Sequence, residues 1–310
     1  MKIFIPKINE AWVVDKFRKE FIKNYPKLVV SNPNKADIIW ILAPWLFHKL
    51  RIEKFKSKKI ICSFYHIDQT KQDSYDLNLL QSIDPFIDQY HTISKKSMID
   101  LKFHTKNKIV QLPFWVNSND FYFLENKEKL KKQFNVKKED YIVGSFQRDS
   151  EGYDLNQPKL IKGPDIFLEI VKKLNNDINN LHIVLTGKRR NYLISNLNNL
   201  KIKYSYFEMV STKTLNRLYN ILDLYIVSSR LEGGPQAILE CATSKTPVIS
   251  TKVGVAEQIL NPISLFDSSK PESFFNAKVD IEYAKNSVKK YETPLGIENF
   301  KYMLEEFYES

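Results

Sequence analysis

The segment that best combines chemically useful residues is 229–250, SRLEGGPQAILECATSKTPVIS. An apolar, strand-like run ends at Ser228, and Glu232 comes just before Gly233, Gly234 and Pro235. Glycines let a backbone approach a ligand closely, and proline suits the first turn of a helix. Because the free N–H groups of a helix N-terminus attract anions, this turn predicts a phosphate site. The alternative is an ordinary strand–turn–helix with acidic side chains on the surface.

A second carboxylate follows in the helix that this turn is predicted to open. Glu240 lies about six residues into that helix, which places it roughly 9 Å along the helix axis. We therefore expect Glu232 and Glu240 to serve separated parts of one ligand.

A second glycine–proline turn lies earlier in the chain. The strand-like run 141–146 leads into Arg148, and after a polar loop Lys162, Gly163 and Pro164 open an apolar-periodic helix. Arginine offers a planar fork for phosphate oxygens and lysine a point charge, so the two together suit a diphosphate. Each side chain alone is equally typical of a solvated surface. Lys159 is an alternative to Lys162 in this role.

The elements that must position these residues alternate between strand and helix, which favours a parallel sheet covered on both faces. Strands are predicted at 2–5, 28–31, 37–43, 59–64, 89–93, 109–112, 141–146, 181–186, 203–207, 223–228, 247–251 and 263–266. Helices are predicted at 10–25, 94–103 with Ser94 as N-cap, 164–175, 189–199, 212–222, 235–244, 272–278, 281–291 and 296–308. The charged segment 124–140 is expected to hold one or two helical turns.

Length and composition set the outer limits. A chain of 310 residues predicts two domains. None of the eight glycines precedes Gly144, which excludes a glycine-rich phosphate loop in the first half. Two cysteines make no disulfide framework, so we expect a reducing compartment, the cytoplasm. The apolar start is too short for a signal sequence, and the longest apolar stretch is ten residues, about half of a membrane span.

Positive charge is concentrated in the first part of the chain. Residues 1–115 hold 20 basic and 11 acidic side chains, which suggests an anionic partner or simply a lysine-rich composition. Segment 44–59 interleaves aromatic and basic residues and predicts an amphipathic helix that contacts an anionic membrane surface. The alternative is that its apolar face packs on the sheet. Nucleic acid is not expected as a partner, because no nucleic-acid-binding module is present.

The order of these motifs resembles the retaining glycosyltransferases of the GT-B fold, family four, also called glycosyl transferases group 1. The motifs are Gly-X-X-X-Arg ending at Arg148, Lys-Gly-Pro-Asp at 162–165, and Glu232 with Glu240. Residues 212–250 resemble the family's helix–strand–turn–helix–strand core. The resemblance implies an α/β fold of two doubly wound Rossmann-like domains facing across a cleft. It places an acceptor-side domain at 1–116, a donor-binding domain at 117–290 and a terminal helix at 291–310 that crosses back.

The resemblance implies retaining transfer of a hexose-type sugar from a UDP- or GDP-linked donor to a hydroxyl of a glycan or lipid acceptor. Arg148 and Lys162 would bind the diphosphate, and Glu232 would contact hydroxyls of the donor sugar. Glu240 would bind the ribose. Neither a metal nor a cofactor is implied. The alternative is a scaffold or nucleotide-sugar-binding protein of the same fold without catalysis.

The remaining implied site residues lie around these. His66, at the end of a predicted strand, would face the donor sugar, although a lone histidine is more often structural or exposed; Asp68 is a weaker candidate. The other expected donor contacts are Gly233, Gly234, Pro235, Gln236, Met209 and Gly144.

Overall fold

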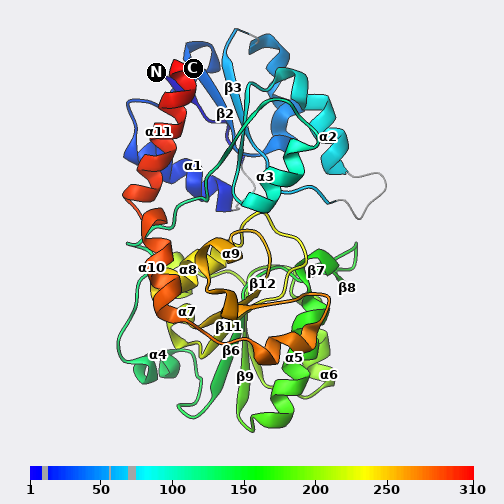
Figure 1. Ribbon diagram of the computed structural model, residues 1–310. Helices are drawn as coiled ribbons and strands as arrows, with labels where there is room; N and C mark the ends of the chain where they lie inside the picture. The colour runs from blue at the N-terminus through cyan, green and yellow to red at the C-terminus, as the bar shows by residue number, and fades with distance from the viewer. Residues whose placement is uncertain (9–12, 56, 69–74) are drawn as a thin grey trace. The chain divides into compact units, whose positions relative to one another are not determined.

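A computed structural model describes residues 1–8, 13–55, 57–68 and 75–310 (Figure 1). The chain divides into two compact units. The first unit combines Met1–Trp115 with the terminal segment Pro294–Ser310, and the second unit is Val116–Thr293. The predicted start of the helix at 10–25 lies partly outside the described residues.

The first unit contains a five-stranded parallel sheet in the order β1-β2-β3-β4-β5. Its strands are β1 (Ile3–Phe4), β2 (Ile38–Ile41), β3 (Lys59–Ser63), β4 (Gln89–Thr92) and β5 (Lys108–Gln111). The predicted strand 28–31 is reduced to a single bridge between Ile3 and Val29.

Alternate side chains of these strands face opposite layers of helices, as a pleated strand requires. Ile38 and Trp40 pack with α1 (Val13–Asn24) and α11 (Leu295–Glu309). Ile39 and Ile41 pack with α2 (Tyr75–Ile83) and α3 (Lys95–Lys102). Figure 1 shows the two helix pairs on opposite sides of the sheet.

Aromatic packing holds α11 to the first unit, although its sequence follows the second. The Phe300 ring stacks on Phe114 with centroids 5.1 Å apart, and on Trp40 at 5.6 Å. Phe300 and Trp40 are fully buried. The terminal helix is therefore part of this core.

Segment 44–59 does not form the predicted amphipathic helix. It forms two short 3-10 helices, η2 (Pro44–Leu50) and η3 (Ile52–Phe55), separated by Arg51 in a left-handed conformation with φ 48°. Phe47 and Ile52 are each 1% exposed and belong to the core. The predicted helix is therefore wrong, whereas the alternative, in which the apolar side chains of this segment pack on the sheet, is confirmed.

The second unit contains a six-stranded parallel sheet in the order β10-β9-β6-β11-β12-β13. Its strands are β6 (Tyr141–Ser145), β9 (Leu181–Thr186), β10 (Tyr204–Phe207), β11 (Leu224–Val227), β12 (Val248–Thr251) and β13 (Leu265–Phe266). One face packs with α5 (Pro164–Asp177) and α6 (Asn191–Asn199). The other packs with α7 (Thr212–Ile221), α8 (Gln236–Ser244), α9 (Ala256–Ile259) and α10 (Ile281–Val288).

Most predicted elements are present, with differences at chain ends and loops. Segment 272–278 forms a 3-10 helix, η7 (Pro271–Asn276), and the helix predicted at 281–291 ends in the 3-10 turn η8 (Lys289–Tyr291). Another 3-10 turn, η5 (Leu160–Lys162), precedes α5. The short hairpin of β7 (Ser150–Glu151) and β8 (Gln157–Pro158) was not predicted, because its polar sequence lacks the apolar alternation of a strand.

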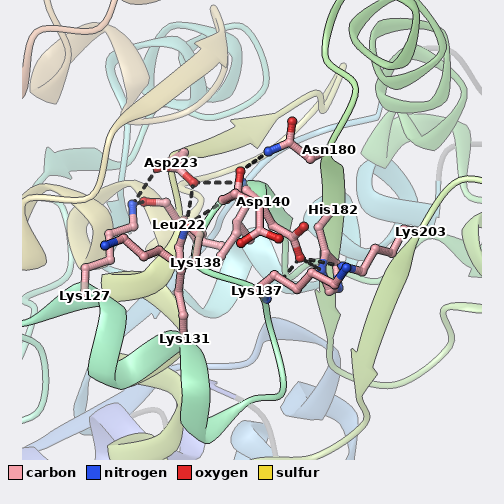
Figure 2. A network of polar contacts seen from close by, with 12 residues as sticks. Lys127, Lys131, Lys137, Lys138, Asp140, Asn180, His182, Lys203, Leu222 and Asp223 are labelled. Atoms are coloured by element: carbon pink, nitrogen blue, oxygen red, sulfur yellow. Dashed lines mark hydrogen bonds and ion pairs between the residues drawn. The ribbon is translucent and has the colours of Figure 1, made fainter.

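The segment that follows the first unit is tied to the amino ends of β6 and β11 (Figure 2). From α4 (Lys127–Gln133), Lys127 Nζ donates to Asp223 Oδ1 at 2.8 Å, and the buried Lys131 Nζ donates to the Asp140 carbonyl at 2.7 Å. Asp223 Oδ2 accepts the backbone N–H of Ile142 at 2.8 Å. Basic side chains of α4 thus stabilise the point where the sheet begins.

His182 continues this network between neighbouring strands. Its Nδ1 lies 3.0 Å from Asp140 Oδ2, its Nε2 lies 2.8 Å from Ser205 Oγ, and Lys203 Nζ lies 2.5 Å from the same Asp140 oxygen. Burial lowers the pKa of His182, and the nearby positive charge of Lys203 adds to this. Burial acts to raise the pKa of Asp140, but hydrogen bonds from Lys203 and His182 outweigh it, so that pKa is lowered.

Candidate active site

The carboxyl ends of β6, β11 and β12 bring the predicted site segments of the second unit together. These strands are neighbours in the parallel sheet, so the loops that follow them leave from one edge, where α/β folds bind ligands. The loop after β6 carries Arg148, and the loop after β11 carries Glu232 and the Gly233–Pro235 turn. The turn before α5 contributes Lys162 to the same place.

Lys162 and Glu232 form an ion pair through Lys162 Nζ and Glu232 Oε1. Their side chains are 22% and 13% exposed, so a part of each still reaches solvent. Ser229 Oγ lies 3.2 Å from the same Glu232 oxygen. Lys162 and Glu232 are 70 positions apart in the sequence, and the fold brings them into contact.

Buried and half-buried hydrogen bonds fix the loops around this pair. Gln147 Nε2 donates to the Lys162 carbonyl at 2.8 Å, and Gln147 Oε1 accepts from Ser229 Oγ at 3.1 Å. From the next strand, Thr251 Oγ1 donates to the Ser229 carbonyl at 2.6 Å. The loops after β6 and β11, the turn before α5 and the end of β12 are thereby held in one arrangement.

Two glycines are required by this arrangement. Gly163 has φ 61°, and a Cβ atom on it would lie 1.8 Å from the Ser228 carbonyl oxygen. Gly254 has φ 55°, and its Cβ would lie 2.8 Å from the Gly233 carbonyl oxygen. An L side chain is disfavoured at positive φ, and at both positions it would also displace a backbone segment of the site.

Arg148 adds positive charge at this edge. The side chain is half-buried, and within residues 1–8, 13–55, 57–68 and 75–310 its buried Nε has no hydrogen-bond partner. Burial lowers the pKa of Arg148, and the charge of Arg189 lowers it further. Burial also lowers the pKa of Lys159, and the positive charge of Arg148 lowers it further. Nearby positive charge thus acts on both Arg148 and Lys159, and a site of this kind is suited to an anion.

The loop that holds Arg148 is anchored by a buried ion pair. Arg190 is fully buried, and its Nε donates to Asp149 Oδ2 at 2.5 Å while its Nη1 donates to the Ser145 carbonyl at 2.7 Å. The Arg189 carbonyl accepts the N–H groups of Asp149 and Ser150 at 3.2 and 3.1 Å. The loops after β6 and β9 are therefore joined, with Arg148 and Arg189 beside each other.

Arg189, Arg190 and Asp149 were missed by the sequence reasoning. The run Gly187-Lys188-Arg189-Arg190 directly follows β9, at the carboxyl edge that already carried Arg148. A cluster of basic residues after a strand neighbouring β6 was the signal that could have found them.

The other residues expected to bind the donor lie at varied places. Pro235 is the N-cap of α8, and Gln236 is its first residue. Glu240, farther along α8, accepts a hydrogen bond from Tyr219 Oη at 2.7 Å. Gly144 lies inside β6, where a Cβ would be 2.4 Å from Leu222 Cδ1, so packing alone accounts for a glycine there. Met209 follows β10 and is 62% exposed.

His66 and Asp68 belong to the first unit. They lie in the loop after β3; His66 is half-buried and Asp68 is 6% exposed. The Asp68 backbone N–H donates to Asp76 Oδ2 at 3.1 Å. Asp76 in turn lies in the first turn of α2, so this loop is fixed to the helix that follows it.

The described residues contain neither a cluster of metal ligands nor a membrane-spanning helix. No group of three or more His, Cys, Asp or Glu side chains there has the arrangement of a metal site. Within those residues no helix has the length and apolar character needed to cross a bilayer.

The two sheets and their helices are those of the GT-B glycosyltransferase fold, as predicted. The chain is similar to Anabaena HepE in complex with UDP and glucose, with a TM-score of 0.78 and 13% identity over 98% of each chain. It is similar to sucrose-phosphate synthase from Thermosynechococcus elongatus (TM-score 0.70, 15% identity, 97% of this chain and 80% of that one). It is also similar to a glycosyltransferase from Rickettsia africae, with a TM-score of 0.65 and 20% identity over 97% of this chain and 83% of that one.

The sequence of the second unit identifies the family. Residues 126–279 match the family model described as Glycosyl transferases group 1. That stretch is about half of the chain and contains the site segments after β6, β9 and β11. The chain belongs to the group 1 glycosyltransferases, which confirms the resemblance seen in its motifs. Comparison with curated protein sequences gives no match.

Proposed function

We propose that the protein is a retaining glycosyltransferase that moves a hexose-type sugar from a UDP- or GDP-linked donor to a hydroxyl of a glycan or lipid. The observation that carries this proposal is the cation cluster at the carboxyl edge of the second sheet. Arg148 and Arg189 lie side by side there, next to the Lys162–Glu232 pair. A group 1 glycosyltransferase needs a site of this kind for the donor diphosphate.

The charges fit a diphosphate. Glu232 offsets Lys162, and Glu151 lies 3.5 Å from Lys159, which leaves the two guanidinium groups as the excess. Two arginines match the charge of a diphosphate ester and offer paired N–H donors to its oxygens. HepE, which shares the fold, is known in complex with UDP-glucose, and this supports the choice of donor class.

The residues would act mainly through electrostatics. When the bond between the sugar and the diphosphate breaks, negative charge develops on the leaving phosphate, and fixed cations stabilise it. Glu232 would accept hydrogen bonds from donor sugar hydroxyls, and Glu240 from the ribose. The acceptor hydroxyl would attack the face from which the nucleotide leaves, and the leaving phosphate would take its proton.

The test is donor turnover by the full chain. UDP- and GDP-sugars are incubated with candidate acceptors, and release of the nucleoside diphosphate is measured for the wild type, Arg148→Ala and Glu232→Gln. Lys138→Ala is the matched control, because this exposed lysine lies at the amino end of the same sheet. We expect both site variants to lose turnover while the control keeps it.

Two outcomes would contradict the proposal. Full turnover in both folded site variants would exclude the assigned site. Tight donor binding without turnover across the acceptor panel would favour the alternative, a nucleotide-sugar-binding or scaffold protein of the same fold.

A further inference from the structure

Helix α3 in the first unit carries Ile99, and Phe103 follows at its end; both are exposed large apolar side chains. Ser97 and Leu101 are buried, four residues apart, so they define the inner side of the helix. With 100° between successive residues, the opposite direction is that of Ile99. Ile99 is 52% exposed, and Phe103, four residues later, is 78% exposed.

Lysines flank these apolar residues. Lys95 and Lys102 lie about 40° and about 60° from Ile99 around the helix axis, and Lys96 lies next to Phe103 in the same projection. All three are exposed, as is Lys106 beyond the helix end. No ion pair of these lysines exists within the described residues. The only acid between residues 95 and 108 is Asp100.

We propose that this surface docks the protein onto an anionic lipid bilayer. The surface, here named the α3 patch, comprises Lys95, Lys96, Ile99, Lys102, Phe103 and Lys106. Apolar side chains ringed by uncompensated lysines are the pattern of an interfacial helix, in which the apolar groups enter the headgroup region and the lysines contact anionic lipids.

A bilayer fits the α3 patch better than a protein partner does. Two apolar side chains are too few for the core of a stable protein interface, and lysine is depleted in such interfaces. Segment 44–59, which the sequence suggested for membrane contact, has its apolar residues Phe47 and Ile52 in the core. In contrast, Ile99 of α3 and Phe103 at its end are exposed.

The experiment is co-sedimentation of the full chain with phosphatidylcholine vesicles that contain either no anionic lipid or about one third phosphatidylglycerol. We expect binding to the anionic vesicles and a marked loss of it when salt is raised, because screening weakens the lysine contacts. Lys95→Gln with Lys102→Gln should lower the partition coefficient about five-fold for each lysine removed. Ile99→Ser with Phe103→Ser should lower it about ten-fold or more.

The matched control is Ile263→Ser with Phe275→Ser in the second unit, where the two side chains are 50% and 42% exposed. It should sediment like the wild type, and all variants should keep the wild-type melting temperature. Three results would overturn the proposal: no binding to anionic vesicles, equal binding to both vesicle types, or patch variants that bind like the wild type. Loss of self-association in the patch variants, with vesicle binding unchanged, would instead identify a second copy as the occupant.

Discussion

The two edges of the sheet in the second unit use similar residues in opposite ways. At the amino edge, lysines of α4 and Lys203 meet the carboxylates of Asp140 and Asp223, and His182 lies between two partners (Figure 2). At the carboxyl edge, burial lowers the pKa of Arg148, and the positive charge of Arg189 lowers it further. The first edge is internally satisfied, whereas the second has positive charge in excess.

Residue types alone therefore do not identify a site. Ser205, His182 and Asp140 are hydrogen-bonded in the order of a hydrolase triad. Lys203 already neutralises Asp140, and Ser205 lies within β10 of the sheet. Uncompensated charge at a strand's carboxyl end, rather than the presence of reactive groups, distinguishes the proposed donor site.

The largest effect is expected on folding stability, from removal of Arg190, which forms a buried ion pair with Asp149 at the carboxyl edge. This buried arginine holds Asp149 and the end of β6. Arg190→Met should lower the free energy of unfolding by about 3–5 kcal/mol, because it leaves Asp149 buried and unpaired. Chemical denaturation measures this. A loss below about 1 kcal/mol would show that the pair does not anchor the loop.

Arg148→Ala should have the opposite profile. We expect turnover of the donor to fall by about 10²–10³-fold, the effect of removing one transition-state donor, with the melting temperature unchanged. Steady-state kinetics and thermal unfolding of the same preparation measure both. A variant that loses stability but keeps turnover would place Arg148 with the structural charges instead.

Asp140→Asn tests the amino edge. The substitution removes the carboxylate that accepts from Lys203 and His182, so the free energy of unfolding should fall by about 1–3 kcal/mol. Donor turnover at saturation should match the wild type. A selective loss of turnover in this variant would contradict the division of roles between the two edges.

The smallest effect concerns pH. Because burial lowers the pKa of His182 in the folded chain, the unfolded chain binds the proton more readily. The contribution of His182 to stability is therefore fully present above the ordinary histidine pKa of about 6.5. It is lost as the pH falls from there through the lowered pKa of the folded chain. His91, whose pKa burial lowers to about 4, acts in the same direction, so the test needs a comparison. Urea unfolding at several pH values should give a shallower pH dependence for His182→Gln than for the wild type; equal slopes would refute the assignment.

Much of the fold was predictable because its strands are short apolar runs between turn residues. Strand β9 and helix α5 were found nearly to their ends, since their periodicity is uninterrupted. Segment 44–59 was not, because the same amphipathic pattern suits a surface helix and a buried 3-10 connection. Local sequence does not say which side of a segment the rest of the chain will cover.

The part of the site that depends on local turn motifs was predictable from the sequence, whereas the part that depends on strand order was not. The glycine–proline sequences at Gly163 and at Gly233–Pro235 predict the two turns. These turns bring Lys162 into contact with Glu232. Arg189 could not be inferred from its own segment, because its position beside Arg148 depends on β9 and β6 being neighbours in the sheet. The role of Gly144 differs too: contact with Leu222 explains it without a ligand.

The most direct test of the central claim is calorimetric titration with UDP, GDP and the corresponding monophosphates. If the excess charge at the carboxyl edge holds a diphosphate, at least one diphosphate should bind about ten-fold or more tightly than its monophosphate, a difference of about 1.4 kcal/mol. Arg148→Ala should abolish that difference, and Lys138→Ala should retain it. Equal affinity for mono- and diphosphates in the wild type, or an unchanged preference in Arg148→Ala, would contradict the account.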